Sequence, residues 1–299
     1  MSVCGMVGSV SGLWRFPVKS MMGEKLEQVE VTERGVLGDR AYALIDTDTG
    51  KVVSAKSVKL FPNIFRCKAS FVEPPRNDRE MPPVRISLPD GTSVASESRD
   101  TERALSAYFN RNVTLARSSP NDFTIDQCHP DVGDLDPGGH HDTVVAQKLG
   151  AALFAEPGME FPVPVGSFLD AFPLSVLTTS TLAQLNELRP ESRFDPRRFR
   201  MNVIVDTKRP GFIENDWVGH ELGLGDGVRI QVALPDPRCV MTTLAQDDLP
   251  RDTDVLRTLF RHNRVQVGSR GQLPCAGVYA VVAAPGTVRT GDRVVFRRI

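Results

Sequence analysis

The sequence predicts a mainly β protein with a smaller helical content (α+β), in which β-barrel-like parts carry peripheral helices. Short segments that alternate apolar and polar residues, such as 7–16 and 25–32, recur along the chain between turn residues. Helical periodicity is confined to three short segments, 100–110, 180–188 and 254–263. The chain has no GxGxxG or Walker loop, which argues against a dinucleotide-binding sheet and against nucleotide hydrolysis.

The individual elements follow from turn residues and apolar patterning. Asp100 precedes the first helical segment as an N-cap, and Leu105 and Phe109 share one face of it. Pro89, Asp90 and Gly91 form the turn of a hairpin. The predicted strands beyond the first two are 40–46, 51–55, 84–88, 92–95, 202–205, a Gly-rich hairpin over 221–233, 277–283 and 293–296.

The length of 299 residues exceeds the usual size of one domain. Asp, Gly, Pro and His dominate residues 120–140 and interrupt the strand pattern. We therefore predict a first domain over 1–122, a linker or long loop over 123–142, and a second domain over 143–299.

Charge and cysteine usage restrict the class of protein. Lys and Arg number 36 and Asp and Glu number 37, so nothing in the net charge of −1 favours nucleic acid or an anionic membrane as a partner. The five cysteines are widely spaced and form no CxxC pair, which argues against a disulfide framework, a zinc site or an iron–sulfur cluster. No signal-peptide pattern or apolar stretch of about 20 residues is present. We expect a cytoplasmic protein.

Cys239 is the candidate nucleophile or metal ligand. It follows a strand, lies in a turn that contains Pro235 and Pro237, and has Arg238 beside it. A neighbouring positive charge favours the thiolate, which is the form that ligates metals. An inert buried thiol is the commoner role for an isolated cysteine, and the residues alone leave both interpretations open.

Basic residues next to strand ends are candidates for phosphate binding. Lys19 and Ser20 follow the first strand, Arg40 opens another, and Arg200 precedes a third that begins at Asn202. Lys and Arg at such positions hold phosphate oxygens by charge-assisted hydrogen bonds. A solvated surface charge is the commoner role for any one of them, and sequence alone does not show that they converge.

Thr178 and Thr179 lie where a strand leads into the second helix. The free N–H groups of a helix N-terminus and adjacent hydroxyls can bind an anion. Ordinary helix capping is the competing and more frequent role of such residues.

Taken in order, these segments resemble the MOSC family, specifically its members with an N-terminal MOSC β-barrel domain. That group includes the mitochondrial amidoxime-reducing component and its bacterial relatives. The similar stretches are 13–20 (LWRFPVKS), 34–40 (RGVLGDR), 172–177 (FPLSVL) with 182–186 (LAQLN), 198–202 (RFRMN), 215–217 (NDW), 238–243 (RCVMTT) and 285–292 (PGTVRTGD). Relatives often have Phe-Arg-Pro-Asn where this chain has Met201 before Asn202.

The resemblance implies an N-terminal barrel domain, a MOSC barrel domain and a molybdenum cofactor (molybdopterin) between them. Cys239 would be the metal ligand and the catalytic residue. The residues that would hold the cofactor are Lys19, Ser20, Arg40, Thr178, Thr179, Arg200, Asn202 and Arg238. At the level of the family, pyridoxal phosphate binding is a weaker expectation.

The function that the resemblance implies is reduction of the N–O bond of small N-hydroxylated compounds. Electrons would come from an external protein of the ferredoxin, flavin or cytochrome type, because the chain has no motif for FAD, haem or a cluster of its own. Two alternatives remain: transfer of sulfur from a persulfide on Cys239, and a cofactor carrier without catalysis.

Overall fold

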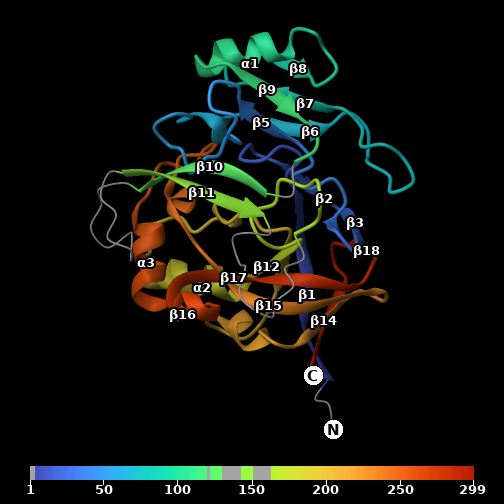
Figure 1. The fold of residues 1–299 in the computed structure, drawn as a ribbon. Helices are drawn as coiled ribbons and strands as arrows, with labels where there is room; N and C mark the ends of the chain where they lie inside the picture. Colours follow the sequence, from blue (N-terminus) through green and yellow to red (C-terminus); the bar gives the residue numbers. More distant parts are fainter. Residues whose placement is uncertain (1–3, 120–121, 130–142, 151–162) are drawn as a thin grey trace.

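A computed structural model of the chain describes residues 4–119, 122–129, 143–150 and 163–299. Within these ranges the fold is mainly β with three α-helices, which confirms the predicted α+β class (Figure 1). The helices are α1 (Thr101–Phe109), α2 (Thr179–Leu188) and α3 (Asp254–His262). None of the helices in the described ranges combines the length and apolar character needed to span a membrane.

Seven of the described strands close into a barrel. Its order is β12 (Leu174–Thr178), β13 (Val203–Asp206), β1 (Cys4–Arg15), β19 (Arg293–Arg297), β14 (Glu221–Leu224), β15 (Val228–Pro237) and β17 (Gln272–Ala284). Pairing of β12 with β17 closes the ring. Alternating apolar residues, such as Val228, Ile230 and Val232, are buried in one core to which all seven strands contribute.

The first strand joins strands from the far end of the chain. β1 pairs antiparallel with both β13 and β19, and β2 (Glu24–Leu26) pairs with β1. β3 (Gln28–Thr32) pairs with β4 (Gly35–Val36) and with β18 (Gly286–Arg289). β16 (Arg264–Gln266) extends the barrel sheet beyond β17. The start of the chain is therefore fastened to the C-terminal barrel before the chain enters its N-terminal part.

The N-terminal part consists of small sheets and α1, at the top of Figure 1. β5 (Ala43–Asp46) pairs with β9 (Val113–Ala116), and β6 (Lys68–Phe71), β7 (Val84–Ser87) and β8 (Ser93–Ala95) form a second sheet. Leu105 and Phe109 of α1 are buried in its core, as predicted. Asp100 precedes α1, but its side chain makes no capping hydrogen bond. The predicted strand 51–55 is wrong, since only Val52 forms a β-bridge.

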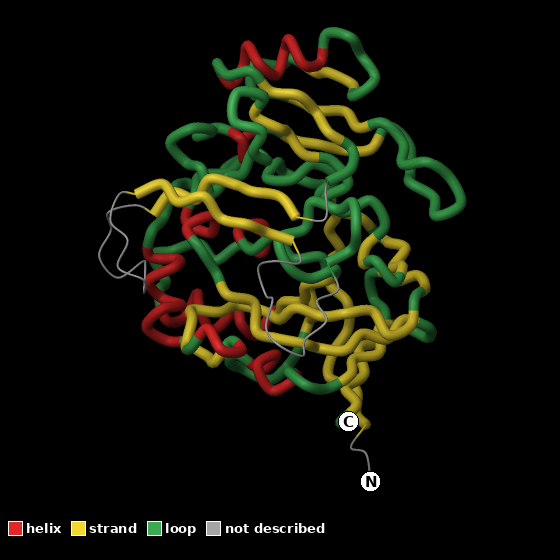
Figure 2. The backbone as a smooth tube through the Cα atoms, viewed as in Figure 1, coloured by secondary structure: helices red, strands yellow, loops and turns green. Residues whose placement is uncertain are grey.

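The predicted loop begins as a strand. β10 (Asp122–His129) pairs antiparallel with β11 (Thr143–Gly150), and the two cross the molecule as a separate ribbon (Figure 2). The expectation of irregular structure from residue 123 is wrong up to residue 129, because Phe123 and Ile125 are buried in an apolar cluster. The rest of the predicted linker, 130–142, lies outside the described residues.

Gly277 in β17 shows how closely the barrel wall is packed. Its φ is +81°, and a Cβ there would lie 2.1 Å from Met201 Cε and 2.5 Å from the Val176 carbonyl oxygen. Gly291, with φ +90°, has open space around it. A side chain at either position would adopt a strained left-handed backbone conformation, but only at Gly277 would it also clash with neighbouring atoms.

We expect Gly277→Ala to destabilise the protein more than Gly291→Ala. Strain at positive φ costs about 1–2 kcal/mol at both sites, and the clash with a backbone carbonyl adds about 1–3 kcal/mol at Gly277 alone. Urea denaturation of both variants measures the difference. Equal losses of unfolding free energy would contradict the close packing of β17 on β12.

Candidate functional site

One cavity of about 300 Å³ brings the N-terminal part, the β10–β11 ribbon and the barrel together. Seven of the nine predicted site residues line it: Lys19, Ser20, Arg40, Arg200, Asn202, Arg238 and Cys239. The separate basic clusters seen in the sequence therefore converge on one space that also contains a thiol.

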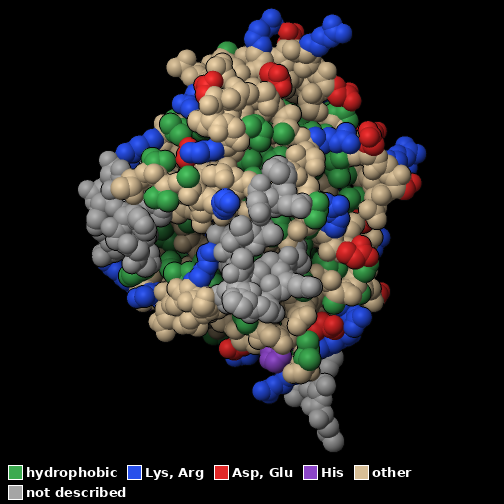
Figure 3. Space-filling view, in the orientation of Figure 1, with side chains coloured by type: hydrophobic (Ala, Val, Ile, Leu, Met, Phe, Trp, Pro, Cys, Tyr) green, Lys and Arg blue, Asp and Glu red, His purple; other side chains and the backbone are tan. Residues whose placement is uncertain are grey.

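The cavity carries a strong excess of positive charge. Its lining includes seven basic side chains (Lys19, Arg40, Lys56, Arg198, Arg200, Arg238, Arg270) and two acidic ones (Asp170, Asp236). On the outer face drawn in Figure 3, by contrast, charges of both signs are interspersed. Concentrated positive charge in a partly enclosed space favours an anionic ligand such as a phosphate.

Asp170 bridges two of the lysines. Lys19 Nζ donates to the Phe168 carbonyl oxygen at 2.8 Å and pairs with Asp170, while Lys56 Nζ lies 3.0 Å from Asp170 Oδ2. Burial lowers the pKa of Lys19 to about 8 despite this partner. Burial also acts to lower the pKa of Lys56, but the negative charges of Asp170 and of a Cys239 thiolate outweigh it and raise that pKa.

Arg40 and Arg200 both lie over the ring of Phe16, at 4.4 and 4.3 Å from its centroid. Arg200 donates to the Met21 carbonyl oxygen at 2.7 Å, and Arg40 donates to the carbonyl oxygen of Arg200 at 3.1 Å. Burial, followed by the nearby charge of Arg40, lowers the pKa of Arg200 to about 9. The two guanidinium groups lie on the same ring. Arg40 forms an ion pair with Asp39, whereas Arg200 has no ion pair among the described residues.

Backbone strain is concentrated at this cavity. Ser20, Arg40 and Arg200 have φ of 65°, 48° and 56°, and they are three of five non-glycine residues with positive φ in the described chain. Such conformations cost about 1–3 kcal/mol and cluster at functional sites. All three are predicted ligand residues, and all three line the cavity.

Asp39 connects the two sides of the site. Its carboxylate accepts from Phe16 N at 2.8 Å, accepts from Asn202 Nδ2 at 2.8 Å, and pairs with Arg40. The other amide atom of Asn202, Oδ1, accepts from Ser175 Oγ at 3.0 Å. Asn202 lines the cavity, but its amide is engaged in positioning Asp39 and hence Arg40.

Cys239 is the accessible thiol. It follows β15 and precedes a 3-10 helix, Val240–Thr243, and its carbonyl oxygen accepts from Thr242 N at 3.1 Å. The thiols of Cys67 and Cys275 are buried, and burial raises the pKa of Cys67 to about 12 and that of Cys275 further. Among these three described cysteines, Cys239 alone is partly exposed and lines the cavity.

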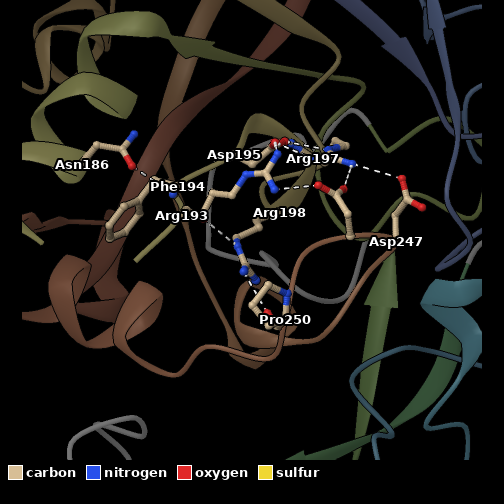
Figure 4. Close-up of polar contacts among 9 residues, drawn as sticks. Asn186, Arg193, Phe194, Asp195, Arg197, Arg198, Asp247 and Pro250 are labelled. Carbon is tan, nitrogen blue, oxygen red and sulfur yellow. Dashed lines mark hydrogen bonds and ion pairs between the residues drawn. The ribbon is translucent and has the colours of Figure 1, made fainter. Parts of the chain in front are cut away.

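Arg198 holds the loop that follows Cys239 (Figure 4). Its side chain is 1% exposed. It donates to the carbonyl oxygens of Thr242 at 3.3 Å and Leu244 at 3.3 Å, and to that of Pro250 at 2.9 Å. Nε donates to the Arg193 carbonyl oxygen at 2.9 Å, which ties the loop to the segment before β13.

A more exposed ion-pair network lies beside this contact. Arg197 forms a two-pronged pair with Asp195, at 2.8 Å through both Nε and Nη2, and reaches Asp248 at 2.7 Å. Arg193 pairs with Asp248 at 2.6 Å. Figure 4 shows Arg197 directed toward Asp247, on the same loop that Arg198 holds from inside.

Thr178 and Thr179 lie outside the cavity. Thr178 caps α2, since its Oγ1 accepts from Thr181 N at 3.1 Å, and it donates to Glu214 at 2.7 Å. Thr179 Oγ1 donates to Asp206 at 2.9 Å. The hydroxyl groups of both threonines are therefore already engaged in hydrogen bonds within the protein, and neither residue lines the cavity.

Several lining residues were not singled out from sequence. Asp236 is two residues before Arg238, pairs with it, and has its pKa raised to about 6 by burial. Tyr279 in β17 lines the same wall and stacks on Phe172 with ring centroids 5.1 Å apart. The sequence did contain one clue to Asp170, because it is a charged residue within the apolar run 168–174. Lys56 carried no such signal.

Unpartnered polar atoms also point to a ligand. Buried side-chain atoms without a hydrogen-bond partner in the described residues include Gln147 Oε1, Asp236 Oδ1 and Arg238 Nε, all on residues that line the cavity. A buried polar group without a partner costs about 1–3 kcal/mol, so such groups need an explanation. Together with the cations and the thiol, they fit a cofactor that has an anionic group, hydrogen-bonding edges and a metal that takes a thiolate ligand.

The fold and site thus define a class: a β-barrel protein whose cationic, thiol-containing cavity is shared with an N-terminal part. Residues 7–118 match the MOSC N-terminal beta barrel domain, and residues 164–295 match the MOSC domain. The chain belongs to the MOSC-domain proteins that carry this N-terminal barrel domain. Membership supports a function related to the molybdenum cofactor.

Curated relatives match along almost the whole chain. Human mitochondrial amidoxime-reducing component 1 is 25% identical over 96% of this chain and 82% of its own length. Human mitochondrial amidoxime reducing component 2 is 25% identical over 96% of this chain and 83% of its own. Among solved structures, the YUAD protein of Bacillus subtilis covers 100% of both chains at 12% identity, with a TM-score of 0.47.

We expect Arg198→Met to loosen the Cys239 loop. The substitution leaves buried carbonyl oxygens without donors, and we expect it to lower the free energy of unfolding by at least about 2 kcal/mol. It should also speed alkylation of Cys239 by iodoacetamide in the folded protein, measured by peptide mass spectrometry. Arg193→Met, on the exposed network, is the matched control and should change neither quantity appreciably. Equal alkylation rates in the two variants would show that Arg198 does not position the loop.

Proposed function

We propose that this protein is a molybdenum-cofactor oxidoreductase that reduces the N–O bond of small N-hydroxylated compounds. The observation that carries the proposal is the partly exposed thiol of Cys239 in a cavity lined by seven basic side chains. The similarity to amidoxime-reducing components over nearly the whole chain supports the substrate class.

The cofactor would be held from both sides of the cavity. Lys19, Arg40 and Arg200 are the donors proposed for its phosphate, because they are cations of the cavity wall, two of them buried (Lys19 and Arg200), and the wall has too few carboxylates to neutralise its cations. Ser20 and Asn202 line the same wall, with Asn202 orienting Arg40 through Asp39. When bound, the cofactor supplies two-electron redox chemistry.

Cys239 is the proposed protein ligand to molybdenum, and Arg238 stabilises its surroundings. Arg238 pairs with Asp236 and donates to the Phe199 carbonyl oxygen, which fixes the charge next to the thiol. A cysteine thiolate is a metal ligand, and a hydroxyl is a poor substitute for it. The residues of the chain thus bind, orient and shield the reacting centre.

Electrons are proposed to come from a separate protein of the ferredoxin, flavin or cytochrome type. A cytoplasmic location is part of the same proposal, and its support is that the three described cysteines are free thiols. Pyridoxal phosphate binding remains a weaker prediction, which no feature of the cavity favours over a molybdenum cofactor.

Turnover tests the proposal directly. Protein made in a host that synthesises the cofactor is supplied with a chemical reductant and an amidoxime, and the amidine is quantified by chromatography. Amidine formed in multiples of the protein concentration supports a reductase. Full molybdenum content without turnover of amidoximes, hydroxylamines or N-hydroxylated bases would instead show a cofactor carrier.

We expect Cys239→Ser to fold normally and to lose reductase activity. Hydroxyl and alkoxide are poor replacements for a thiolate toward this metal. Circular dichroism and thermal denaturation check the fold, and amidine formation checks the activity. Cys67→Ser is the control for loss of a thiol, and it should retain activity at temperatures where it is folded. Unchanged turnover by Cys239→Ser would rule out the ligand assignment.

We expect Lys19→Ala, Arg40→Ala and Arg200→Ala to purify with reduced molybdenum content. Removal of one partner of a buried charge-assisted contact costs about 2–5 kcal/mol, enough to release a cofactor during purification. Arg76→Ala and Arg79→Ala, away from this cavity, are the controls and should keep their metal. Elemental analysis normalised to folded protein measures the effect. Full metal in all three variants would contradict the proposed cradle.

A further inference from the structure

The β10–β11 ribbon forms one wall of the cavity. In Figures 1 and 2 it crosses between the N-terminal sheets and the barrel. Gln127 of β10 and Gln147 of β11 are lining residues of the cavity. Neither is among the residues proposed to hold the cofactor.

One face of the ribbon combines an apolar cluster with two glutamines. Phe123, Ile125 and Leu149 are buried in a cluster with Phe168, and the rings of Phe123 and Phe168 lie 5.9 Å apart. Ile125 pairs with Gln147 across the strands, and alternate residues of a strand share a face. Gln127 and Gln147 therefore lie on the same face of the ribbon as the apolar cluster: Gln147 is directly opposite Ile125, and Gln127 is opposite Val145, two residues further along β10.

Hydrogen bonds fasten β10 to the segment that carries Lys56. Val52 N donates to the Thr124 carbonyl oxygen at 2.9 Å, and Ser57 Oγ donates to the Asp126 carbonyl oxygen. Lys51 pairs with the Asp126 carboxylate at 2.5 Å. Gln127 follows Asp126 and so lies beside the segment of Lys56, whose ammonium interacts electrostatically with Cys239. Both glutamines therefore line the same cavity as Lys56 and Cys239.

Gln147 offers an acceptor that the described residues leave unused. Its Oε1 is buried and has no hydrogen-bond partner among them. The cations of the cavity are donors without acceptor capacity, whereas a neutral amide oxygen accepts an N–H without adding charge. An uncharged ligand with N–H groups satisfies this oxygen, and an N-hydroxylated amidine has such a group beside the N–O bond.

We propose that Gln147, with Gln127 beside it, determines substrate specificity by accepting a hydrogen bond from the amino group of an N-hydroxylated amidine. The inference rests on the proposed reductase function and adds the part of the substrate that is recognised. Gln147 orients the amino group, so that the adjacent N–O bond is presented to the Cys239 end of the cavity.

The test compares two ligands on the same holoenzyme. Benzamidoxime has the N–H groups, and its N,N-dimethyl analogue lacks them. We expect Gln147→Leu to weaken binding of benzamidoxime about tenfold, the size of one hydrogen bond from a ligand, and to change binding of the dimethyl analogue less than about twofold. Titration calorimetry gives both dissociation constants, and molybdenum content is measured on the same samples.

Two further variants complete the design. Gln147→Glu keeps an acceptor oxygen and should retain the preference for benzamidoxime. Lys148→Leu, on the exposed face of the same strand, is the matched control and should leave both constants unchanged. Because the ratio of two constants is taken within one protein sample, a smaller folded fraction does not affect it.

The outcomes separate this inference from the proposed function. An unchanged ratio in Gln147→Leu overturns the role of Gln147, whether or not the enzyme turns over. Loss of molybdenum with an unchanged ratio also overturns it and assigns the residue to the cofactor. If the wild-type protein binds benzamidoxime but produces no amidine, a changed ratio in Gln147→Leu still supports the binding role of Gln147, while the reductase proposal fails.

Discussion

Four cationic side chains, Lys19, Lys56, Arg198 and Arg200, are each less than a tenth exposed and line one cavity. Burial of a charge is unfavourable unless it is paired or solvated by polar groups. The structure meets this constraint in three ways: the carboxylate of Asp170 for the lysines, backbone carbonyl oxygens for Arg198, and the ring of Phe16 for Arg200. The cavity keeps an excess of positive charge, which favours an anionic ligand.

The path of the chain explains how these groups meet. β1 is part of the barrel, and the chain passes from it into the N-terminal part. Lys19 and Ser20 lie at this junction, shortly after β1 ends. Asp39 then links Phe16, Asn202 and Arg40 across the same junction. The β10–β11 ribbon supplies the third wall. Each wall depends on the others, because most of the charged contacts join segments far apart in sequence.

The sequence predicted the parts of the site that lie next to recognisable local patterns. Cys239 followed a strand in a proline-containing turn, and Lys19, Arg40 and Arg200 belonged to stretches that resemble one family in order. Convergence of these residues on a single cavity required the structure. Thr178 and Thr179 satisfied a local pattern too, but capping of α2 and contacts to Glu214 and Asp206 occupy them.

Long-range pairing explains the features that sequence did not predict. Nothing local shows that β1 pairs with β13 and β19, or that Asp170 meets Lys56. The strand over 122–129 was not predicted, because the polar residues that follow it suggested a loop. Phe123 and Ile125 nevertheless alternate with polar residues as in a strand. Lys56, an isolated lysine in the sequence, became a candidate only through its neighbours.

We propose that the cavity holds a molybdenum cofactor ligated through Cys239. Elemental analysis of the wild-type protein, made in a host that synthesises the cofactor, tests it most directly, with intact-mass measurement of the same sample. We expect one molybdenum per chain and no added sulfur on Cys239. Protein without molybdenum that carries a labile persulfide on Cys239 would contradict it and would favour sulfur transfer.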